Sequence, residues 1–300
     1  MKAWLVVNGF LKQKKFDEIH QWLYEAGKNY DIAISIYTND QLLATVMEQK
    51  LTLLQQREQV DFVIFWDKDI LLAKTLEQMG LPVFNSSEAI RICDHKALTH
   101  IALGKYGIPM PDTIVAPMTY ENIGYPNVDF LEEVMEKLGL PLVIKECFGS
   151  FGQQVYLCHT KEEVRQKVLA LQGKPFIFQQ MIAGCAGHDA RLQVVGNKVV
   201  AAMERTAKEG DFRANITNGG TMKAYTPTPE EAGLAIRCCE ILQADFAGVD
   251  ILWDAQGKPL VCEVNSNAHF KNIYDCTGVN TAEHIMEHLR NRMERKQCTV

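Results

Sequence analysis

Residues 247–267 read AGVDILWDAQGKPLVCEVNSN, and this stretch decides the fold of the C-terminal part of the chain. Two apolar runs flank the polar residues 254–257, which is the pattern of two antiparallel strands joined by a turn. Alternation along the second strand predicts two faces, with Val261, Glu263 and Asn265 on one and Leu260, Cys262 and Val264 on the other. If the connecting loop has an even number of residues, Asp250 pairs opposite Val261 or Glu263 and shares their face.

Asp250, Glu263 and Asn265 are therefore expected to converge on this hairpin. Two carboxylates and an amide on one face of an apolar hairpin would repel each other and lose hydration unless a cation lay between them. Such oxygen ligands suit a Mg²⁺ ion that nucleotide phosphates also hold. The alternative is a solvated hairpin face with these residues turned outward. Replacing Asp250 by Asn or Glu263 by Gln is expected to abolish metal-dependent activity with little change in thermal stability.

A second segment with potential chemistry is PLVIKECFGSFGQQVYL, residues 141–157. It reads as a strand carrying Lys145, followed by a loop with Gly149, Ser150 and Gly152. Glycines let backbone N–H groups turn toward a phosphate, and a lysine on the preceding strand reaches the same anion. The sequence matches neither the dinucleotide pattern nor the Walker pattern, so an ordinary hairpin turn is an equal alternative.

A third segment, MERTAKEGDFRANITNGG at residues 203–220, contains Arg205, Arg213 and Asn215. Arg213 and Asn215 are two residues apart, so in extended backbone they point the same way. Guanidinium groups clamp phosphate or carboxylate groups. The alternative here is a surface loop with solvated charges.

The N-terminal part of the chain alternates strands with helices. The apolar runs at residues 3–8, 31–37, 61–67 and 81–85 read as strands, and a polar helix is expected from Gln41 to Gln59. This alternation predicts a parallel, doubly wound sheet. Ligands on such sheets gather at the carboxyl ends of the strands, which here carry Asn8 and residues 67–69.

Composition excludes several classes of protein. The chain has 300 residues, of which 47% are apolar and 23% charged, so it has the composition of a globular protein of two or more domains. Its formal charge of −6 argues against a nucleic-acid partner, and no run approaches about 18 apolar residues, so no membrane partner is expected. Nine cysteines without a C-x-x-C pair read as reduced thiols of a cytoplasmic protein.

One metalloenzyme pattern is set aside. His284, Glu287 and His288 match H-x-x-E-H, which is typical of some zinc peptidases. Helical spacing instead makes Ala282, Ile285, Met286, Leu289 and Met293 the buried stripe and leaves the two histidines at its flank.

The three segments at residues 141–157, 203–220 and 247–267, in this order and spacing, together resemble the ATP-grasp superfamily and, within it, the RimK-type carboxylate–amine ligases. The resemblance implies an α/β plus α+β fold: a Rossmann-like N-terminal pre-ATP-grasp domain at 1–88, linker helices and a central ATP-grasp lid at 89–184, and a C-terminal ATP-grasp domain with the metal site at 185–300. It also implies that ATP is held between the last two.

The resemblance implies a role for individual residues. Asp250, Glu263 and Asn265 would bind Mg²⁺, for which Mn²⁺ could substitute, and Arg205 would lie close to the reacting carboxylate. The residues implied to contact ATP are Lys96, Lys145, Gly149, Ser150, Gly152, Gln179, Gln180, Met181, Asp189, Arg213 and Asn215. Arg205 and Arg213 would be the catalytic cations. Where relatives have a Pro-Gly loop after the metal asparagine, this chain has Asn267, Ala268, His269 and Phe270, so Asn267, His269 and Phe270 are expected to contact the substrate.

The activity implied is ATP-dependent amide or peptide bond formation through an acyl phosphate. Its partners would be ATP, an amino acid such as glutamate, and a carboxylate-bearing small molecule, peptide or protein. Two alternatives remain open: a dipeptide ligase of the D-alanine or glutathione-forming type, and a nucleotide-binding sensor that shares the fold without turnover. The resemblance also allows self-association into a homo-oligomer.

Overall fold

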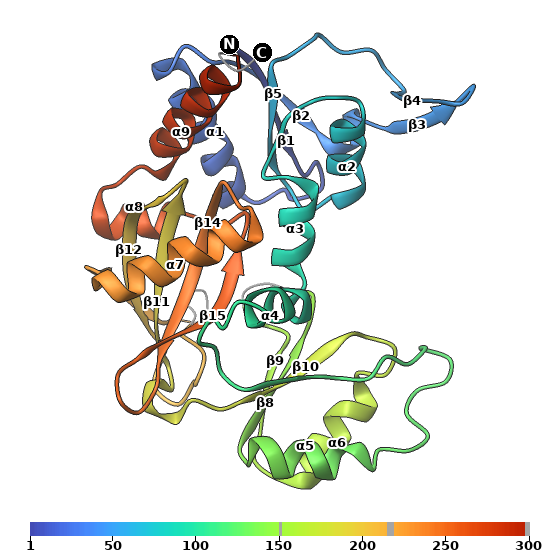
Figure 1. The fold of residues 1–300 in the computed structure, drawn as a ribbon, viewed down its shortest axis with the longest axis vertical. Helices are drawn as coiled ribbons and strands as arrows, with labels where there is room; N and C mark the ends of the chain where they lie inside the picture. Colours follow the sequence, from blue (N-terminus) through green and yellow to red (C-terminus); the bar gives the residue numbers. More distant parts are fainter. Residues whose placement is uncertain (150–151, 215–218, 298–300) are drawn as a thin grey trace.

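The structure is a computed structural model, which describes residues 1–149, 152–214 and 219–297 (Figure 1). Its strands are β1 (Lys2–Val7), β2 (Ala33–Thr38), β3 (Ala44–Met47), β4 (Lys50–Leu53), β5 (Phe62–Trp66), β6 (Val83–Phe84), β7 (Thr113–Val115), β8 (Leu142–Glu146), β9 (Val155–Cys158), β10 (Phe176–Gln180), β11 (His188–Val195), β12 (Lys198–Thr206), β13 (Thr221–Ala224), β14 (Phe246–Trp253) and β15 (Pro259–Asn265). Its α-helices are α1 (Lys14–Asn29), α2 (Ile70–Gln78), α3 (Ser87–Asp94), α4 (Lys96–Gly104), α5 (Phe130–Leu138), α6 (Lys161–Ala170), α7 (Pro229–Leu242), α8 (Lys271–Thr277) and α9 (Thr281–Gln297).

The N-terminal sheet is parallel, with strand order β2-β1-β5-β6, as the alternating pattern predicted. Side chains along β1 alternate between its two faces: Leu5 packs with α1 and α9, whereas Val6 packs with α2. Both faces are thus covered by helices, which explains why β5 reads as a continuous apolar run. The carboxyl ends of β1 and β5 face the rest of the molecule.

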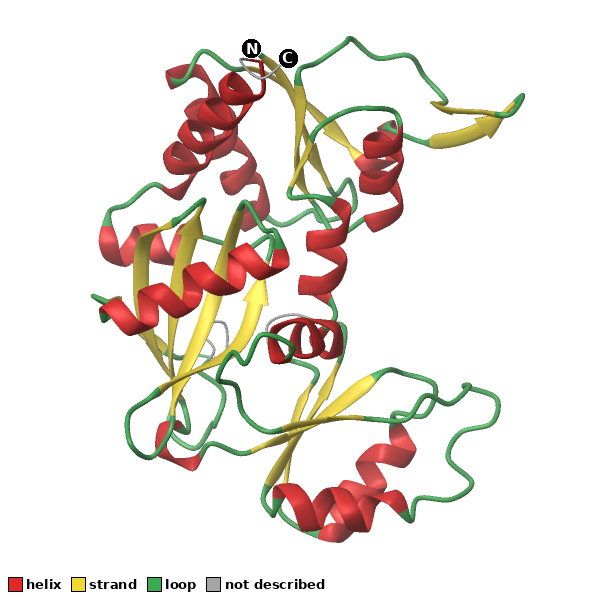
Figure 2. Cartoon of the chain, viewed as in Figure 1, coloured by secondary structure: helices red, strands yellow, loops and turns green. Residues whose placement is uncertain are grey.

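The helix predicted from Gln41 to Gln59 is wrong. Strands β3 and β4 form an antiparallel hairpin there, which projects away from the remainder of the chain (Figure 2). The turn residues Glu48 and Gln49 both have positive φ, at 50° and 63°. A two-residue hairpin turn of this kind is usually marked by Asn or Gly, and without that signal the polar sequence resembles a solvated helix.

The lid is the antiparallel sheet β7-β10-β8-β9 with helices α5 and α6 on one face. Phe176 and Phe178 of β10 point into the core beneath these helices, so Gln179 and, on the neighbouring strand, Lys145 lie on the opposite face. This face of the lid sheet, which carries Lys145 and Gln179, is on the side of the C-terminal sheet and lines the space between them.

The C-terminal sheet is antiparallel, with order β13-β12-β11-β14-β15. One face packs against α7 through Ala190, Leu192 and Val249, which are fully buried. Alternation turns Asp189 and Arg191 to the other face, which lines the space between this sheet and the lid. Helix α7 begins with a capping box in which Thr228 and Glu231 satisfy each other's backbone N–H groups.

Asn85 connects the N-terminal and C-terminal sheets. Its side chain is fully buried and donates to the carbonyl oxygens of Phe246 (2.8 Å) and Ser266 (2.9 Å), while its Oδ1 accepts from the backbone N–H of Asp245 (2.7 Å). It thereby fixes the start of β14 and the end of β15 relative to β6. These are the strands that carry the predicted metal ligands.

The arrangement of sheets confirms the predicted α/β plus α+β fold class, whereas the domain limits at residues 88 and 184 stay predictions. In the parts of the chain that the structure describes, no helix combines the length and the apolar character needed to cross a membrane.

Candidate active site

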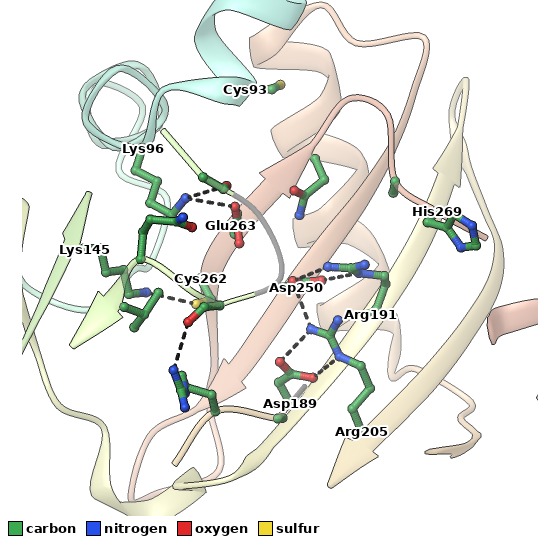
Figure 3. A pocket seen from close by; sticks show the side chains of 18 of the residues that line it. Cys93, Lys96, Lys145, Asp189, Arg191, Arg205, Asp250, Cys262, Glu263 and His269 are labelled. Atoms are coloured by element: carbon green, nitrogen blue, oxygen red, sulfur yellow. Dashed lines mark hydrogen bonds and ion pairs between the residues drawn. The ribbon is translucent and has the colours of Figure 1, made fainter. Parts of the chain in front are cut away.

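A cavity of about 560 Å³ lies where the lid, the C-terminal sheet and the carboxyl ends of the N-terminal strands meet. The lid contributes Lys145 and Gln179, the C-terminal sheet contributes Asp250 and Glu263, and the N-terminal part contributes Asn8. Figure 3 shows the charged side chains that converge in it. Every described residue predicted to contact metal or nucleotide lines this cavity.

The three predicted metal ligands share one wall of the cavity. Asp250 and Glu263 are direct partners in the β14–β15 register, and Asn265 is opposite Gly248. The strict alternation predicted for β15 is wrong, because a register shift between Asp250 and Ile251 brings Val261 opposite Ile251. Val261 therefore enters the core with Val264, and Cys262 faces the cavity beside Glu263.

Asp250 is surrounded by two arginines. Arg191 donates from Nε to Oδ1 and from Nη2 to Oδ2, both at 2.7 Å, and Arg205 Nη2 lies 3.0 Å from Oδ2. Burial alone would disfavour the carboxylate, but the two guanidinium charges outweigh it and lower the pKa of Asp250 to about 2. Asp250 is thus a charged, pre-oriented carboxylate.

Arg205 also binds Asp189, with Nε and Nη2 each 2.6 Å from a carboxylate oxygen. Asp189 and Arg205 are register partners on β11 and β12, just as Arg191 and Asp250 are on β11 and β14. The result is a buried group of two acids and two bases without net charge. Asp189 lines the cavity, and its contact with ATP stays a prediction.

Glu263 faces Lys96, whose Nζ lies 3.4 Å from its Oε1. Burial works against ionisation of Glu263, but the lysine charge prevails and lowers its pKa. The Nδ2 atom of Asn265 is buried with no hydrogen-bond partner. Two ionised carboxylates and an adjacent amide fit a Mg²⁺ ion, which takes oxygen ligands and few of them from protein. Among the described residues no three His, Cys, Asp or Glu side chains form a metal-binding group, so the predicted set would consist of Asp250, Glu263 and the side-chain oxygen of Asn265.

The predicted phosphate-binding groups lie opposite these carboxylates. Lys145 Nζ is 3.5 Å from Cys262 Sγ, and Lys96 Nζ is 3.5 Å from the carbonyl oxygen of Gly149. Gly149 has φ of 138°, and a Cβ there would come within 2.4 Å of Gln154 Oε1, so the backbone requires glycine. Arg213 Nη1 donates to the carbonyl oxygen of Gly152 (3.0 Å). Ser150 and Asn215 lie outside the described residues.

Three of the residues predicted to contact ATP, Gln179, Gln180 and Met181, lie at the end of strand β10 and directly after it. Gln179 is buried, and its Nε2 contacts His100 Nε2 (2.9 Å) and Thr113 Oγ1 (3.0 Å). Because burial lowers the pKa of His100 to about 4, its imidazole is neutral and accepts from Gln179. Gln180 and Met181 line the cavity directly. The side chain of Gln179 therefore mainly fixes the position of strand β10, rather than contacting a ligand.

The three residues predicted to contact the substrate separate into two groups. Asn267 and His269 line the cavity where it borders the N-terminal part of the chain. Phe270 corrects the prediction: it is fully buried and packs against Trp66 and Trp22. Helix α8 begins directly after Phe270. His269 faces the cavity, whereas the next side chain, Phe270, faces the core and anchors the loop there.

Sequence reasoning placed Asn8 and residues 67–69 at a ligand-binding edge, but it missed Arg191 and Lys15 as parts of this cavity. Arg191 stands two residues after Asp189 in a strand, which alone would have placed both on one face. The contribution of Lys15 had no local signal, because helix α1 reaches the cavity only through tertiary packing.

Comparisons with known proteins agree with this geometry. Relatives include a probable alpha-L-glutamate ligase of Pseudomonas putida, 36% identical over 218 residues that cover 72% of this chain and 69% of the relative. The beta-citrylglutamate synthase B of Danio rerio is 29% identical over 239 residues, 78% of this chain and 58% of the relative.

Solved structures share the fold. A RimK domain ATP-grasp protein of Sphaerobacter thermophilus superimposes with a TM-score of 0.71 at 20% identity, over 96% of this chain and 99% of the other. The ATP-grasp ligase PsnB, solved with minimal precursor, Mg and ADP, gives 0.70 at 15% identity, over 97% and 98%. D-alanine–D-alanine ligase of Bacillus anthracis with ATP gives 0.69 at 19% identity, over 98% and 99%.

The sequence model of the RimK-like ATP-grasp domain family matches residues 93–289 of this chain. These residues include the lid, strands β11 and β12 with Arg191 and Arg205, and the β14–β15 hairpin. This chain therefore belongs to the RimK-like ATP-grasp family of carboxylate–amine ligases.

Proposed function

We propose that this protein is an ATP- and Mg²⁺-dependent ligase that joins an amino acid such as glutamate to the carboxylate of a small-molecule, peptide or protein acceptor. The observation that carries the proposal is the pairing of cations with carboxylates across one cavity. Lys145 and Lys96 face Asp250 and Glu263, and Arg205 lies between Asp189 and Asp250. Membership of the family supports ligase chemistry, and the named relatives support an amino acid as one substrate.

The proposed reaction begins with transfer of the γ-phosphoryl group of ATP to the acceptor carboxylate. The amine nitrogen then bonds to the acyl carbon while the carbon–oxygen bond to phosphate breaks, which yields an amide, ADP and phosphate. Lys96, Lys145 and Arg213, which line the cavity, would neutralise charge on the phosphate oxygens as the phosphoryl group moves. Arg205 would orient the acceptor carboxylate.

Asp250, Glu263 and Asn265 would hold the Mg²⁺ ion, which supplies electrostatic stabilisation of the transferring phosphoryl group when bound. Mn²⁺ would be accepted by the same oxygen ligands. The loop that contains Gly149 and Gly152 would exclude water from the acyl phosphate. No covalent nucleophile of the protein is needed.

We also propose a cytoplasmic location. The eight cysteines among the described residues are all free thiols, and six of them are buried. Thiols in this state are typical of a reducing compartment.

The test is an ADP-release assay with ATP, Mg²⁺, L-glutamate and a panel of acceptor acids, with products identified by mass spectrometry. We expect ADP release that requires both an amine and an acid, with an amide product. Glu263→Gln should reduce this by at least about a thousandfold, since a charge ligand of the metal is lost. The matched control is Glu240→Gln on the exposed side of α7, which should keep wild-type activity.

Two outcomes would contradict the proposal. Tight nucleotide binding without turnover for any acid and amine pair would identify a nucleotide-binding sensor. A product formed only from two D-amino acids, or from a thiol-containing dipeptide and glycine, would identify a ligase of the D-alanine or glutathione-forming type, whose fold is shared.

A further inference from the structure

The corner between helices α3 and α4 is formed by His95. Its backbone N–H donates to the carbonyl oxygen of Ile92 (3.3 Å) at the end of α3. Its Nδ1 accepts from the backbone N–H of Leu98 (3.3 Å) in the first turn of α4. Figure 1 shows the two helices at an angle to each other, between the N-terminal part and the lid. His95 therefore ends one helix and caps the next.

The imidazole of His95 makes a further contact, with the lid. It meets the ring of Phe148 edge-to-face, with ring centroids 4.9 Å apart and ring planes at 82°. This is a geometry that aromatic pairs prefer. Phe148 follows β8 and stays 47% exposed, and it is not a member of the lid core. Its ring thus packs on a residue outside the lid.

Neither ring is part of the cavity lining that the described residues form, but the residue after each ring is. Lys96 follows His95, Gly149 follows Phe148, and both line the cavity. The Nζ atom of Lys96 lies 3.5 Å from the carbonyl oxygen of Gly149, and its backbone N–H donates to the carbonyl oxygen of Cys147 (3.1 Å). The ring pair therefore lies directly behind the place where the glycine loop meets α4.

Lys96 connects this loop to the C-terminal sheet. Its Nζ also lies 3.4 Å from Glu263 Oε1, and its side chain is only 11% exposed (Figure 3). One ammonium group thus has a partner on the lid side and a partner among the predicted metal ligands. Its position depends on how closely the loop at Phe148 and Gly149 approaches α4.

His95 makes both of its side-chain contacts as a neutral ring. Its Nδ1 accepts the N–H of Leu98 only while that nitrogen carries no proton. Burial lowers the pKa of His95, and the charges of Arg91 and Lys96 lower it further, against the opposing effects of a backbone hydrogen bond and of Asp94. The ring is therefore neutral near pH 7 and adds no positive charge beside Lys96.

We propose that His95 is a positioning residue: by packing on Phe148 it holds the glycine loop against α4 and so fixes Lys96 for contact with the nucleotide phosphates. His95 itself touches no ligand. The inference rests on the proposed function, since it takes Lys96 and the glycine loop as phosphate-binding groups. The other role of His95 is to cap α4, and the test separates the two.

The test measures nucleotide binding rather than turnover. Isothermal titration calorimetry on the full chain, with Mg²⁺ and a non-hydrolysable ATP analogue, gives the Kd of each variant. His95→Asn keeps a capping side chain but lacks the ring, and Phe148→Ala removes the partner ring. We expect each to weaken binding about three- to tenfold, the value of one aromatic pair. Phe148→Tyr retains a ring and should bind as the wild type does.

A double variant shows whether the two rings act together. Combining His95→Asn with Phe148→Ala should weaken binding no more than either change alone, because both remove the same contact. The matched control is His159→Ala, an exposed histidine of the lid, which should keep the wild-type affinity. A thermal melt of each variant confirms folding.

Lysine acetylation then shows whether His95 acts through Lys96. With the nucleotide analogue at saturation, acetylation rates of individual lysines are followed by peptide mass spectrometry. Lys96 should be acetylated faster in His95→Asn and in Phe148→Ala than in the wild type, since its contacts are loosened. Lys145, whose strand does not depend on the ring pair, should keep its wild-type rate. A loss of helix capping alone would not produce this difference in Phe148→Ala.

Wild-type affinity of His95→Asn would overturn the inference, because the cap alone would then suffice. Additive losses in the double variant, a Phe148→Tyr variant as weak as Phe148→Ala, or an unchanged acetylation rate of Lys96 would also overturn it. Ligase activity found together with any of these results would leave the proposed function intact. Conversely, coupled rings in a protein that releases ADP with no acid and amine pair would refute the proposed function alone.

Discussion

The lid and the remainder of the molecule are stabilised in different ways. The lid core is formed only by residues between 114 and 178, beneath α5 and α6. The core of the N-terminal sheet, by contrast, extends into the C-terminal part: Phe62 and Trp66 share one cluster with Phe246, Phe270 and helix α9. Two sheets far apart in sequence thus have a common core, whereas the central part of the chain has a core of its own.

The described contacts across the lid boundary combine polar bonds with a small buried apolar cluster of Ala97, Cys147 and Ile177. They include the backbone bond from Lys96 to the carbonyl of Cys147 (3.1 Å), the Lys145–Cys262 contact and the Gln179–His100 bond. Because the lid has a core of its own, we expect the cavity wall that it forms to separate more easily than the wall formed by the C-terminal sheet. Lids in enzymes of this kind commonly move to admit substrate and exclude water.

The largest expected effect tests this division directly. Phe62→Ala and Phe178→Ala each remove a fully buried ring, at a cost of about 3–5 kcal/mol in unfolding free energy. Hydrogen exchange should show that Phe62→Ala accelerates exchange in both the N-terminal and C-terminal sheets. Phe178→Ala should accelerate it in β7 to β10 alone.

Uniform acceleration over the whole chain in Phe178→Ala would show that the lid is not a separate unit. If β14 of the Phe62→Ala variant keeps its wild-type protection from hydrogen exchange, the two outer sheets are independent. Either result would replace the comparison with a different division of the chain.

A smaller effect is expected from the two carboxylates on the cavity wall. Asp250→Asn leaves Arg191 and Arg205 with one buried carboxylate between them, so we expect a loss of about 3 kcal/mol in unfolding free energy. Glu263→Gln affects only the longer, more exposed contact with Lys96 and should cost below about 1 kcal/mol. Chemical denaturation without ligand would measure both. For Asp250→Asn, this prediction differs from the expectation from sequence that thermal stability changes little; for Glu263→Gln, the two agree.

The last prediction concerns the pH dependence of stability in the C-terminal sheet. Glu231 on α7 is buried and accepts from Trp253 Nε1 (2.7 Å) and the Tyr225 hydroxyl (2.9 Å). Burial opposes its charge, but these bonds prevail and hold its pKa below the ordinary 4.5. The contribution of ionised Glu231 to the free energy of unfolding is therefore fully present above about pH 4.5. It is lost as the pH falls through the lowered pKa of Glu231.

Glu231→Gln should accordingly destabilise the C-terminal sheet by about 1–3 kcal/mol at pH 7, and the difference from wild type should shrink as the pH is lowered below 4.5. Urea denaturation monitored by the fluorescence of Trp253 would follow it. A difference that stays constant down to pH 3 would mean that Glu231 is not ionised in the folded protein.

Much of this fold was predictable because the relevant signals are local. Apolar runs such as residues 62–66 and the turn at 254–257 gave strands whose pairing follows from topology. The hairpin at residues 44–53 was missed because its turn uses Glu48 and Gln49 in left-handed conformations without glycine.

In the candidate site, the convergence of Asp250 and Glu263 followed from strand alternation. The shift that exchanges Val261 and Cys262 had no sequence signal, because it arises from how β15 pairs with its neighbour. The ion pairs of Arg191 and Arg205 require knowledge of which strands are adjacent, and the position of Lys15 requires the packing of α1. Sequence therefore predicts which residues share a face more readily than which partners they meet.

The buried cysteines give the molecule its own reporters of local opening. Cys158 lies in the lid core, and Cys238 lies on the buried face of α7, in the core of the C-terminal sheet. Burial raises the pKa of both thiols, to about 12 for Cys238, so neither reacts with an alkylating reagent while its surroundings stay closed. The alkylation rates of Cys158 and Cys238 would measure how fast the lid core and the core of the C-terminal sheet open. No substitution in the chain is needed for this measurement.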